Sequence, residues 1–248
     1  MISLKSKREI EIMAEAGRVM KAVFTAVEPM VKAGVTTLQL DQMAEKVIRD
    51  AGAKPAFKGY RNFPGTACIS VNEEVVHGIP GDRVIKDGDI VSFDCGVLLN
   101  GYNVDAARSW GCGKLTDQKR KLIATARDSF LSGLNAYVPG ARIGDLSAAI
   151  QECIESRGFQ VVRDFVGHGI GKAIHEDPQV PNYGKAGRGP KIESGLCLAI
   201  EPMVTEGHSA VEILEDGWTV VTQDGKMASH YEDTIAFTDQ GILNLTCD

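Results

Sequence analysis

The stretch SFDCGVLLNGYNVDAARSW, from Ser92 to Trp110, decides the fold of this chain. In its middle, Asn100-Gly101 is the strongest short signal for a two-residue β-hairpin turn, and a turn there sets the pairing of the flanking strands. Apolar residues then form one continuous face, while Asp94 and Asp105 fall on the other. Asp105 lies opposite Gly96, so the two acids are diagonal neighbours, about 7–8 Å apart at the backbone.

Two like charges placed in this way repel each other and destabilise the hairpin. The plain interpretation is that both carboxylates face water, and for an arbitrary pair of acids on a hairpin it is the better one. A cation bound between the two acids would remove the repulsion instead. The choice between these interpretations depends on what the rest of the chain brings to the same place.

Three later segments offer further donors in similar settings. In VGHGIGKAIHE, His168 and His175 lie among glycines, which disfavour a helix and favour close packing of backbones. In LCLAIEPM, an apolar strand ends at Glu201, and Pro202 favours an extended conformation for that acid. In HYEDTIAF, alternation places Glu232 on a face of small or polar groups. A lone histidine or acid is usually structural or solvated, so the prediction rests on their combination.

The combined donors are two aspartates, two glutamates and one histidine, namely Asp94, Asp105, Glu201, Glu232 and His168. Such an oxygen-rich set suits hard or borderline divalent ions such as manganese, iron or cobalt better than a thiolate zinc site would. Five donors, several of them able to bridge, indicate two ions about 3.5–4 Å apart, as in aminopeptidases and phosphatases.

The composition restricts the class of protein. The 248 residues carry a net charge of −6 and a pI of about 5.5, which argues against a general nucleic-acid or membrane-surface binder and predicts no DNA partner. The charged first residues lead into no apolar segment, and no run reaches the length of a membrane-spanning helix, so we expect a cytoplasmic protein with no membrane partner. The six cysteines form no Cys-x-x-Cys pair, which favours reduced thiols over a zinc ribbon.

Helical and strand signals occur twice in the same order along the chain. We expect helices over residues 5–31, 36–50, 116–137 and 143–157, with strands and loops over 66–112 and 159–245. This repeated order suggests an internal duplication, and Gly34 and Gly52 around the second helix match Gly140 and Gly158 around the fourth. The expected fold is α+β, one domain of two pseudo-symmetric halves, about 1–112 and 113–248, with helices outside the sheets.

Five segments carry a resemblance to a known family. The chain resembles methionine aminopeptidase of the short type I form, from about residue 4 to the C-terminus, in NEEVVHGIP, KDGDIVSFDCGV, GHGIGKAIHEDPQV, AIEPMV and HYEDTIAFTDQG. The resemblance implies the pita-bread fold, a pseudo-twofold α+β duplication with antiparallel sheets inside and helices outside, in a single catalytic domain. It also implies a metal-dependent aminopeptidase that removes N-terminal methionine from nascent proteins when the second residue is small.

The resemblance also implies how the metals are held. Asp105 and Glu232 would bridge two divalent ions, Asp94 would bind one ion with both of its oxygens, and His168 and Glu201 would bind the other. The ions would be cobalt, manganese, iron, zinc or nickel, with a monovalent cation nearby.

The remaining site residues follow from the same resemblance. Glu201 would take a proton from the attacking water, His175 would stabilise the oxyanion, and His77 would contact the scissile amide nitrogen. Both histidines would also bind the substrate. The pocket for the methionine side chain would comprise Tyr60, Phe63, Cys68, Trp218 and Phe57. Without the family, Phe63 and Trp218 are best interpreted as core and His77 as a turn residue.

The chain departs from the family pattern at two places. Asn103-Val104 precedes Asp105 where the family often has His-Gly, which we expect to change hairpin packing but not coordination. Phe57 stands where some members have a small residue or cysteine, so we expect a narrower pocket entrance.

Other interpretations differ in class. A proline-specific aminopeptidase of this fold usually has a large extra N-terminal domain, and the type II methionine enzyme has a helical insertion in its second half; we expect neither here. A pita-bread protein that has lost its metal and only binds partners would lack ligands, and all five are present.

We expect a monomer acting on nascent polypeptide N-termini. Lys185, Arg188 and Lys191 form a basic loop. The plain interpretation is a solvated surface loop, and the more specific one is contact with ribosomal RNA.

Overall fold

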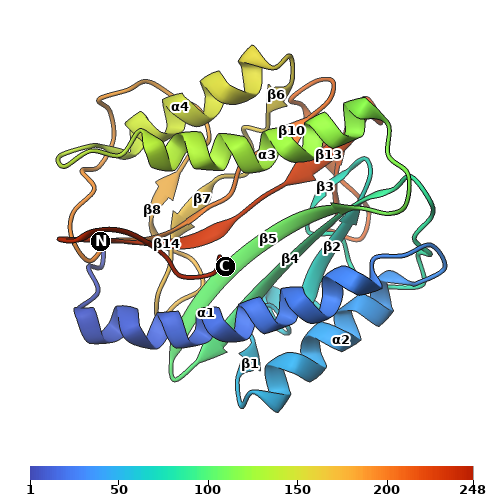
Figure 1. The fold of residues 1–248 in the computed structure, drawn as a ribbon, viewed down its shortest axis with the longest axis horizontal. Coiled ribbons are helices and arrows are strands. Elements are labelled where there is room, and N and C mark those ends of the chain that lie inside the picture. Colours follow the sequence, from blue (N-terminus) through green and yellow to red (C-terminus); the bar gives the residue numbers. More distant parts are fainter. Residues whose placement is uncertain (248) are drawn as a thin grey trace.

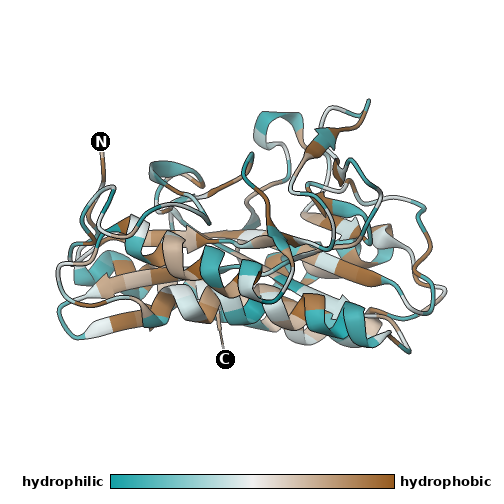
Figure 2. Cartoon of the chain, turned by 90° about the horizontal axis from the view of Figure 1, so that it is seen from above, coloured by the Kyte–Doolittle hydropathy of each residue, from teal (hydrophilic) through white to brown (hydrophobic). Residues whose placement is uncertain are grey.

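The computed structural model describes residues 1–247, and its helices lie along one side of its strands. Figure 2 shows the helices on that side and most of the connecting loops on the other. The helices are α1 (Lys7–Val27), α2 (Thr37–Asp50), α3 (Asp117–Asn135) and α4 (Ile143–Ser156), with 3-10 turns η1 (Glu28–Met30) and η2 (Tyr60–Asn62). α1 packs on α2 and α3 packs on α4, and the two pairs lie at opposite edges of the view in Figure 1.

The predicted helices are confirmed to within a few residues because their ends carry local signals. Ser6 and Thr36 cap α1 and α2 in capping boxes with Glu9 and Gln39. The expected first helix is interrupted at Glu28, where a 3-10 turn with proline at its start begins. No helix within residues 1–247 combines the length and the apolar character needed to cross a membrane.

Within the described residues the strands form four antiparallel sheets. In one, β4 (Ile90–Leu99) pairs with β1 (Lys54–Pro55), β2 (Ala67–Val71) and β5 (Tyr102–Gly111). A second has the order β15 (Gly241–Asn244), β14 (Asp233–Thr238), β9 (Cys197–Ile200), β7 (Gly167–Gly169) and β8 (Glu176–Val180). Two smaller sheets contain β13 (Ala228–His230), β10 (Met203–Thr205) and β6 (Gln160–Val161), and β11 (Val211–Ile213), β12 (Val220–Thr222) and β3 (Glu74–Val76).

The hairpin of β4 and β5 has the predicted register. Asn100 and Gly101 form its turn, both with positive φ (51° and 83°), as a primed two-residue turn requires. Gly96 lies opposite Asp105, and Val97 lies opposite Val104. The predicted apolar face is confirmed as core: the side chains of Val91, Phe93, Cys95, Val97, Val104 and Ala106 are fully buried. The other face is therefore free to point its acids towards the second large sheet.

The two large sheets are joined where the acids lie. The backbone N–H of Asp105 donates to Oγ1 of Thr234 at 2.8 Å, and that hydroxyl donates to the Asp105 carbonyl oxygen at 2.8 Å. Two residues further along β5, Ala107 and Glu232 exchange backbone hydrogen bonds of 3.1 and 3.0 Å. This seam between β5 and β14 places residues of distant segments side by side.

The helices α2 and α4 are framed by equivalent glycines. Gly34 and Gly140 precede them with φ of 93° and 89°, and Gly52 and Gly158 follow them with φ of 73° and 83°. Both helices have 14 residues. These equivalences support the proposed duplication, and the division of the chain near residue 112 stays a prediction.

Candidate functional site

A cavity of about 600 Å³ opens between the two large sheets. Every site residue expected from the sequence lines it. They are the acids Asp94, Asp105, Glu201 and Glu232, the histidines His77, His168 and His175, and the pocket residues Phe57, Tyr60, Phe63, Cys68 and Trp218.

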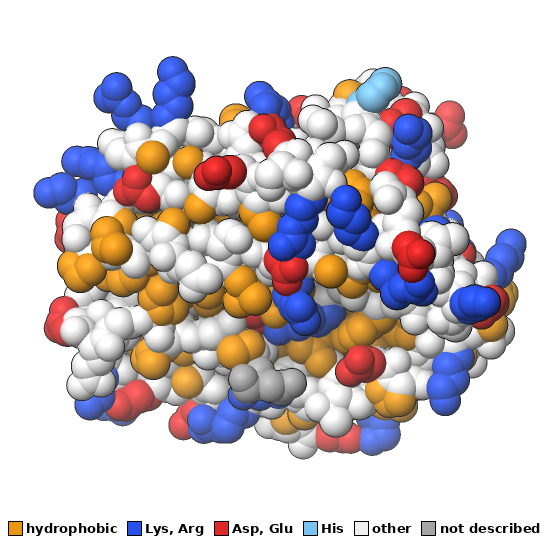
Figure 3. Space-filling model, turned by 45° about the horizontal axis from the view of Figure 1, so that its top comes forward, with side chains coloured by type: hydrophobic (Ala, Val, Ile, Leu, Met, Phe, Trp, Pro, Cys, Tyr) orange, Lys and Arg blue, Asp and Glu red, His pale blue; other side chains and the backbone are white. Residues whose placement is uncertain are grey.

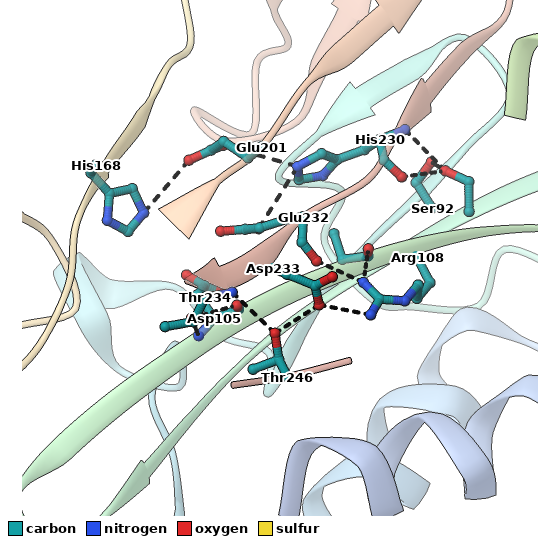
Figure 4. Close-up of polar contacts among 12 residues, drawn as sticks. Ser92, Asp105, Arg108, His168, Glu201, His230, Glu232, Asp233, Thr234 and Thr246 are labelled. Carbon is teal, nitrogen blue, oxygen red and sulfur yellow. Dashed lines mark hydrogen bonds and ion pairs between the residues drawn. The ribbon is translucent and has the colours of Figure 1, made fainter. Parts of the chain in front are cut away.

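Five different segments bring the predicted metal ligands to this cavity. Asp94 and Asp105 come from β4 and β5, His168 from β7, Glu201 from the residue after β9, and Glu232 from the residue before β14. Figure 4 shows Asp105, His168, Glu201 and Glu232 grouped around a common space. One ligand atom each of Asp105, His168 and Glu232 lies within 4.8 Å of the others.

The glycines beside His168 allow its strand to fit between β8 and β9. A Cβ atom at Gly167 would lie 2.4 Å from the carbonyl oxygen of Ala199, and one at Gly169 would lie 2.1 Å from that of Asp177. Nδ1 of His168 lies 2.9 Å from the carbonyl oxygen of Gly169. A proton on Nδ1 leaves Nε2 as a lone-pair donor, and Nε2 lies 3.6 Å from Oε1 of Glu201.

Three acids of the cavity each leave one carboxylate oxygen without a partner. Oδ1 of Asp94, Oδ1 of Asp105 and Oε1 of Glu232 are buried without a hydrogen bond. Burial raises the pKa of Asp94 to about 7, and burial together with the neighbouring carboxylates raises the pKa values of Asp105, Glu201 and Glu232 well above their ordinary range. Buried acids are rarely left without a counter-charge, so unpaired oxygens beside an imidazole fit divalent cations.

The two histidines that are not predicted to be ligands, His77 and His175, flank the donors. The rings of His175 and His168 lie 4.3 Å apart, and Nδ1 of His175 is 3.0 Å from the hydroxyl of Tyr60. His77 has a φ of 61°, a left-handed conformation that side chains rarely adopt. Its ring meets that of Trp218 edge-on, with centroids 6.0 Å apart, and burial lowers its pKa to about 4. Strained backbone of this kind persists where the surroundings hold it and is common at functional sites.

The aromatic side chains form one wall of the cavity. Phe63 and Trp218 pack edge to face with centroids 5.0 Å apart. Cys68 lies opposite Asp94 in the β2–β4 pair, which puts its thiol beside the acids. Phe57 packs over Gly96, where a Cβ would lie only 2.8 Å from the Phe57 ring. Phe57 thus contacts the hairpin as well as lining the cavity.

Asn103, one of the two departures from the family pattern, links the hairpin to the histidine segment. Its Nδ2 donates to the carbonyl oxygens of Gly171 and Lys172, both at 3.0 Å. Val104 is fully buried in the core. Asn103 thus forms a side-chain bridge from the hairpin to the segment between His168 and His175, and a change in hairpin packing relative to the family stays a prediction.

Sequence reasoning missed two residues at this site. Nε2 of His230 lies 4.0 Å from Oε2 of Glu201 and 3.8 Å from Oε2 of Glu232. A signal was present, because residues two apart in a strand share a face and His230 precedes Glu232 by two. The second missed residue is Arg108. Its Nη1 donates to the carbonyl oxygen of Glu232 at 2.6 Å, and its guanidinium pairs with buried Asp233. No sequence pattern pointed to Arg108.

The profile of metallopeptidase family M24 matches residues 11–239. The chain belongs to metallopeptidase family M24. Among M24 relatives, it is 50% identical over 246 residues to the methionine aminopeptidase of Clostridium perfringens, covering 99% of each chain. It is 42% identical to the crystal structure of methionine aminopeptidase from Thermotoga maritima, with a TM-score of 0.98 and 100% of both chains covered.

These M24 relatives confirm the resemblance and the pita-bread fold predicted from the sequence. A prolidase from Pyrococcus furiosus is 24% identical with a TM-score of 0.81, and the match covers 99% of this chain but 65% of the prolidase. That likeness shows the shared fold alone.

Proposed function

We infer that the protein is a metal-dependent aminopeptidase that removes N-terminal methionine from nascent proteins when the second residue is small. The observation that carries this inference is the set of buried, unpartnered carboxylate oxygens beside His168, in a cavity walled by aromatic side chains. The similarity over nearly the full length to proteins named methionine aminopeptidase supports the same activity.

Two divalent ions fit this donor set, held by Asp94, Asp105, His168, Glu201 and Glu232. The donors favour manganese, iron or cobalt. The family resemblance adds zinc and nickel as candidates, and it also implies a monovalent cation near the two divalent ions. When bound, such ions lower the pKa of water and polarise a carbonyl group. Without a cation the acids do not share this space easily as charged groups, because burial and the neighbouring carboxylates raise the pKa values of Asp105 and Glu232.

The carboxylate of Glu201 is proposed as the group that moves the proton. This carboxylate lines the cavity beside the other donors, with Oε1 3.6 Å from Nε2 of His168, so its oxygen is placed to take a proton from water and hold it. The proton then passes to the nitrogen of the leaving amine. His77, at the rim of the cavity, is proposed to contact that nitrogen.

His175 is proposed to stabilise the oxyanion, since its ring is exposed to the cavity and oriented by the hydroxyl of Tyr60. Replacement by alanine is expected to lower kcat by about 10²-fold, as loss of one oxyanion donor does. Metal content, measured on the same samples, is expected to stay unchanged; loss of an ion would make His175 a ligand instead.

The methionine side chain is proposed to enter the wall formed by Phe63 and Trp218, with Tyr60, Cys68 and Phe57 completing the pocket. An apolar recess lined by aromatic rings suits an unbranched thioether, which gains from contact with ring edges. The packing of Phe57 against Gly96 supports a narrow entrance to this recess.

The substrates are proposed to be nascent chains in the cytoplasm, met by a monomer that contacts the ribosome through Lys185, Arg188 and Lys191. These side chains are exposed on a loop fixed to α4, where Gly144 N–H donates to the Arg188 carbonyl oxygen at 3.0 Å. Figure 3 shows basic side chains gathered at the upper left edge of the face drawn, with basic and acidic side chains interspersed over the rest of it. Charge reversal of the loop should weaken ribosome co-sedimentation in a salt-dependent way, whereas reversal of the exposed lysines 7, 32 and 54 should not. Equal binding by both variants would leave the loop simply solvated.

Methionine release from a Met-Ala peptide tests the main proposal. We expect turnover with manganese or cobalt, none with EDTA, and little from a matched Met-Leu peptide. A protein that binds these peptides without releasing methionine under any metal would instead be a binding protein on an M24 fold.

A further inference from the structure

His230 closes the far side of the metal site, away from His168. It is the last residue of β13, and its side chain is 1% exposed. Nε2 is buried without a hydrogen-bond partner. Figure 4 shows the ring pointing at the carboxylates of Glu201 and Glu232, with His168 on the opposite side of Glu201.

The distances from this ring exclude hydrogen bonds. Nε2 of His230 is 4.0 Å from Oε2 of Glu201 and 3.8 Å from Oε2 of Glu232, whereas an N–H···O bond spans about 2.7–3.2 Å. Two donors bound to one ion at about 2.0–2.2 Å each can lie up to roughly 4.2 Å apart. The gap of 3.6 Å between His168 and Glu201 falls in the same range. Both imidazoles therefore stand where they could share an ion with Glu201.

The backbone holds His230 in place from both sides. Its N–H donates to Oγ of Ser109 at 2.9 Å, and that hydroxyl lies 2.8 Å from the His230 carbonyl oxygen and 2.7 Å from Oγ of Ser92. Met203 pairs with His230 across β10 and β13. The ring is thus aimed by fixed strands, which is how metal ligands are usually positioned.

We propose that His230 is an additional nitrogen ligand of the metal centre, on the side of Glu201 and Glu232, so that the centre contains two imidazoles. The three residues form a second donor set whose ligand atoms lie within 4.8 Å of one another, besides the set of Asp105, His168 and Glu232. The proposal rests on the metal site assigned above. A second imidazole makes the centre softer and favours cobalt, iron, nickel or zinc over manganese.

A structural histidine is the competing explanation. A buried ring can simply fill space between strands, but it usually pairs its polar nitrogens when it does so. Here Nε2 has no partner, and the nearest polar atoms are carboxylate oxygens at ion-sharing distance. An ion supplies the missing partner for the nitrogen and the oxygens together.

Cobalt(II) binding and the structure of the cobalt-loaded protein test this assignment. Isothermal titration with cobalt(II) is run on the full chain, on His230→Gln and His230→Ala, and on His77→Gln as the matched control. His77 lines the same cavity and belongs to neither donor group found among the described residues. We expect both His230 variants to bind at least one ion about 10-fold or more weakly, beyond what His77→Gln does. Anomalous diffraction from the cobalt-loaded wild type should place an ion about 2.0–2.3 Å from Nε2 of His230.

Two results would overturn the proposal. One is cobalt affinity in His230→Gln and His230→Ala equal to that of wild type, and the other is a loaded structure with every ion farther than about 3 Å from Nε2. Circular dichroism shows whether each variant is folded, and the diffraction result needs no variant. Failure of the proposed function would look different, because wild type would then bind no cobalt stoichiometrically or release no methionine.

Discussion

At the scale of single residues, Asp105 and Glu232 are the acids that depend most on a counter-charge. Asp105 is 3% exposed and Glu232 2%, and each leaves one carboxylate oxygen without a partner. Burial raises the pKa of both acids; the charge of Glu232 raises that of Asp105 further, and the charges of Glu201 and Asp94 raise that of Glu232 further. A cation relieves a cost that the metal-free protein must carry.

Asp105→Asn and Glu232→Gln are therefore expected to abolish methionine release while leaving the fold intact. Removing a residue that only hydrogen-bonds to a metal ligand typically lowers activity by roughly 10–100-fold. The loss of activity in these two variants should be larger than that. Because an amide cannot ionise in the buried site, the metal-free variants should melt no lower than metal-free wild type. Peptide assays at saturating metal and thermal melts in EDTA measure both effects. Near-normal turnover of either variant would contradict a two-ion site.

The residues of the site differ in how far the sequence predicts them. Asp94 and Asp105 follow from the turn at Asn100-Gly101, because turn type fixes register and register fixes the face. The spacing of His230 and Glu232 indicates a shared face, but the approach of His230 to Glu201 depends on contacts between distant segments. The conformation of His77, likewise, is set by its surroundings and by no local pattern.

At the scale of elements, the N-terminal segment holds the segment that carries His175. The Lys5 side chain is 3% exposed, and its Nζ lies 2.7 Å from Oε2 of Glu176 and 3.0 Å from the carbonyl oxygen of Ser3. Oε1 of Glu176 accepts from the N–H of Ala173 at 3.1 Å. The ion pair thus fixes both ends of the turn on which His175 stands.

Lys5→Met is expected to destabilise the protein by about 2–3 kcal/mol, because it leaves Glu176 largely buried without its partner. It should also lower kcat more than it raises KM, since His175 loses its support. The double variant Lys5→Met/Glu176→Gln should recover part of the stability, and Lys7→Met, an exposed neighbour, should change little. Urea unfolding and peptide kinetics measure these effects; equal stability of Lys5→Met and Lys7→Met would contradict the role of the pair.

Elements are the level at which the sequence predicts best. Helix ends follow from caps such as Ser6 and Thr36, and those signals are local. The seam between β5 and β14 could not be predicted in the same way, since the hydroxyl of Thr234 bonds to a strand far away in sequence. Sheet order depends on such non-local pairings, and the family resemblance supplied what local patterns could not.

At the scale of the whole molecule, the buried site couples folding to pH. The acids have raised pKa values in the fold, about 7 for Asp94 and well above the ordinary range for Asp105, Glu201 and Glu232. Such groups bind more protons folded than unfolded, so their contribution is lost as pH rises through the folded pKa. His168, lowered to about 4 by burial, acts in the opposite sense and destabilises the fold as pH falls below about 6.5.

Between pH 6.5 and 8.5 the carboxyl groups of this site dominate the expected sign, because the histidines of the unfolded chain lose only their remaining protons near pH 6.5. The buried Cys68 thiol, whose pKa burial also raises, acts in the same sense as the carboxyl groups. Metal-free protein should lose stability between pH 6.5 and 8.5, by about 1.4 kcal/mol per pH unit for each carboxyl that stays protonated in the fold. For a chain of this size that corresponds to roughly 2–4 °C per kcal/mol in Tm. With saturating manganese the fall should disappear, because cations replace the protons. Thermal melts in EDTA and in manganese across this range measure the difference, with Asp94→Asn giving a shallower fall. A metal-free Tm that rises over the same range would mean that the acids are compensated in some other way.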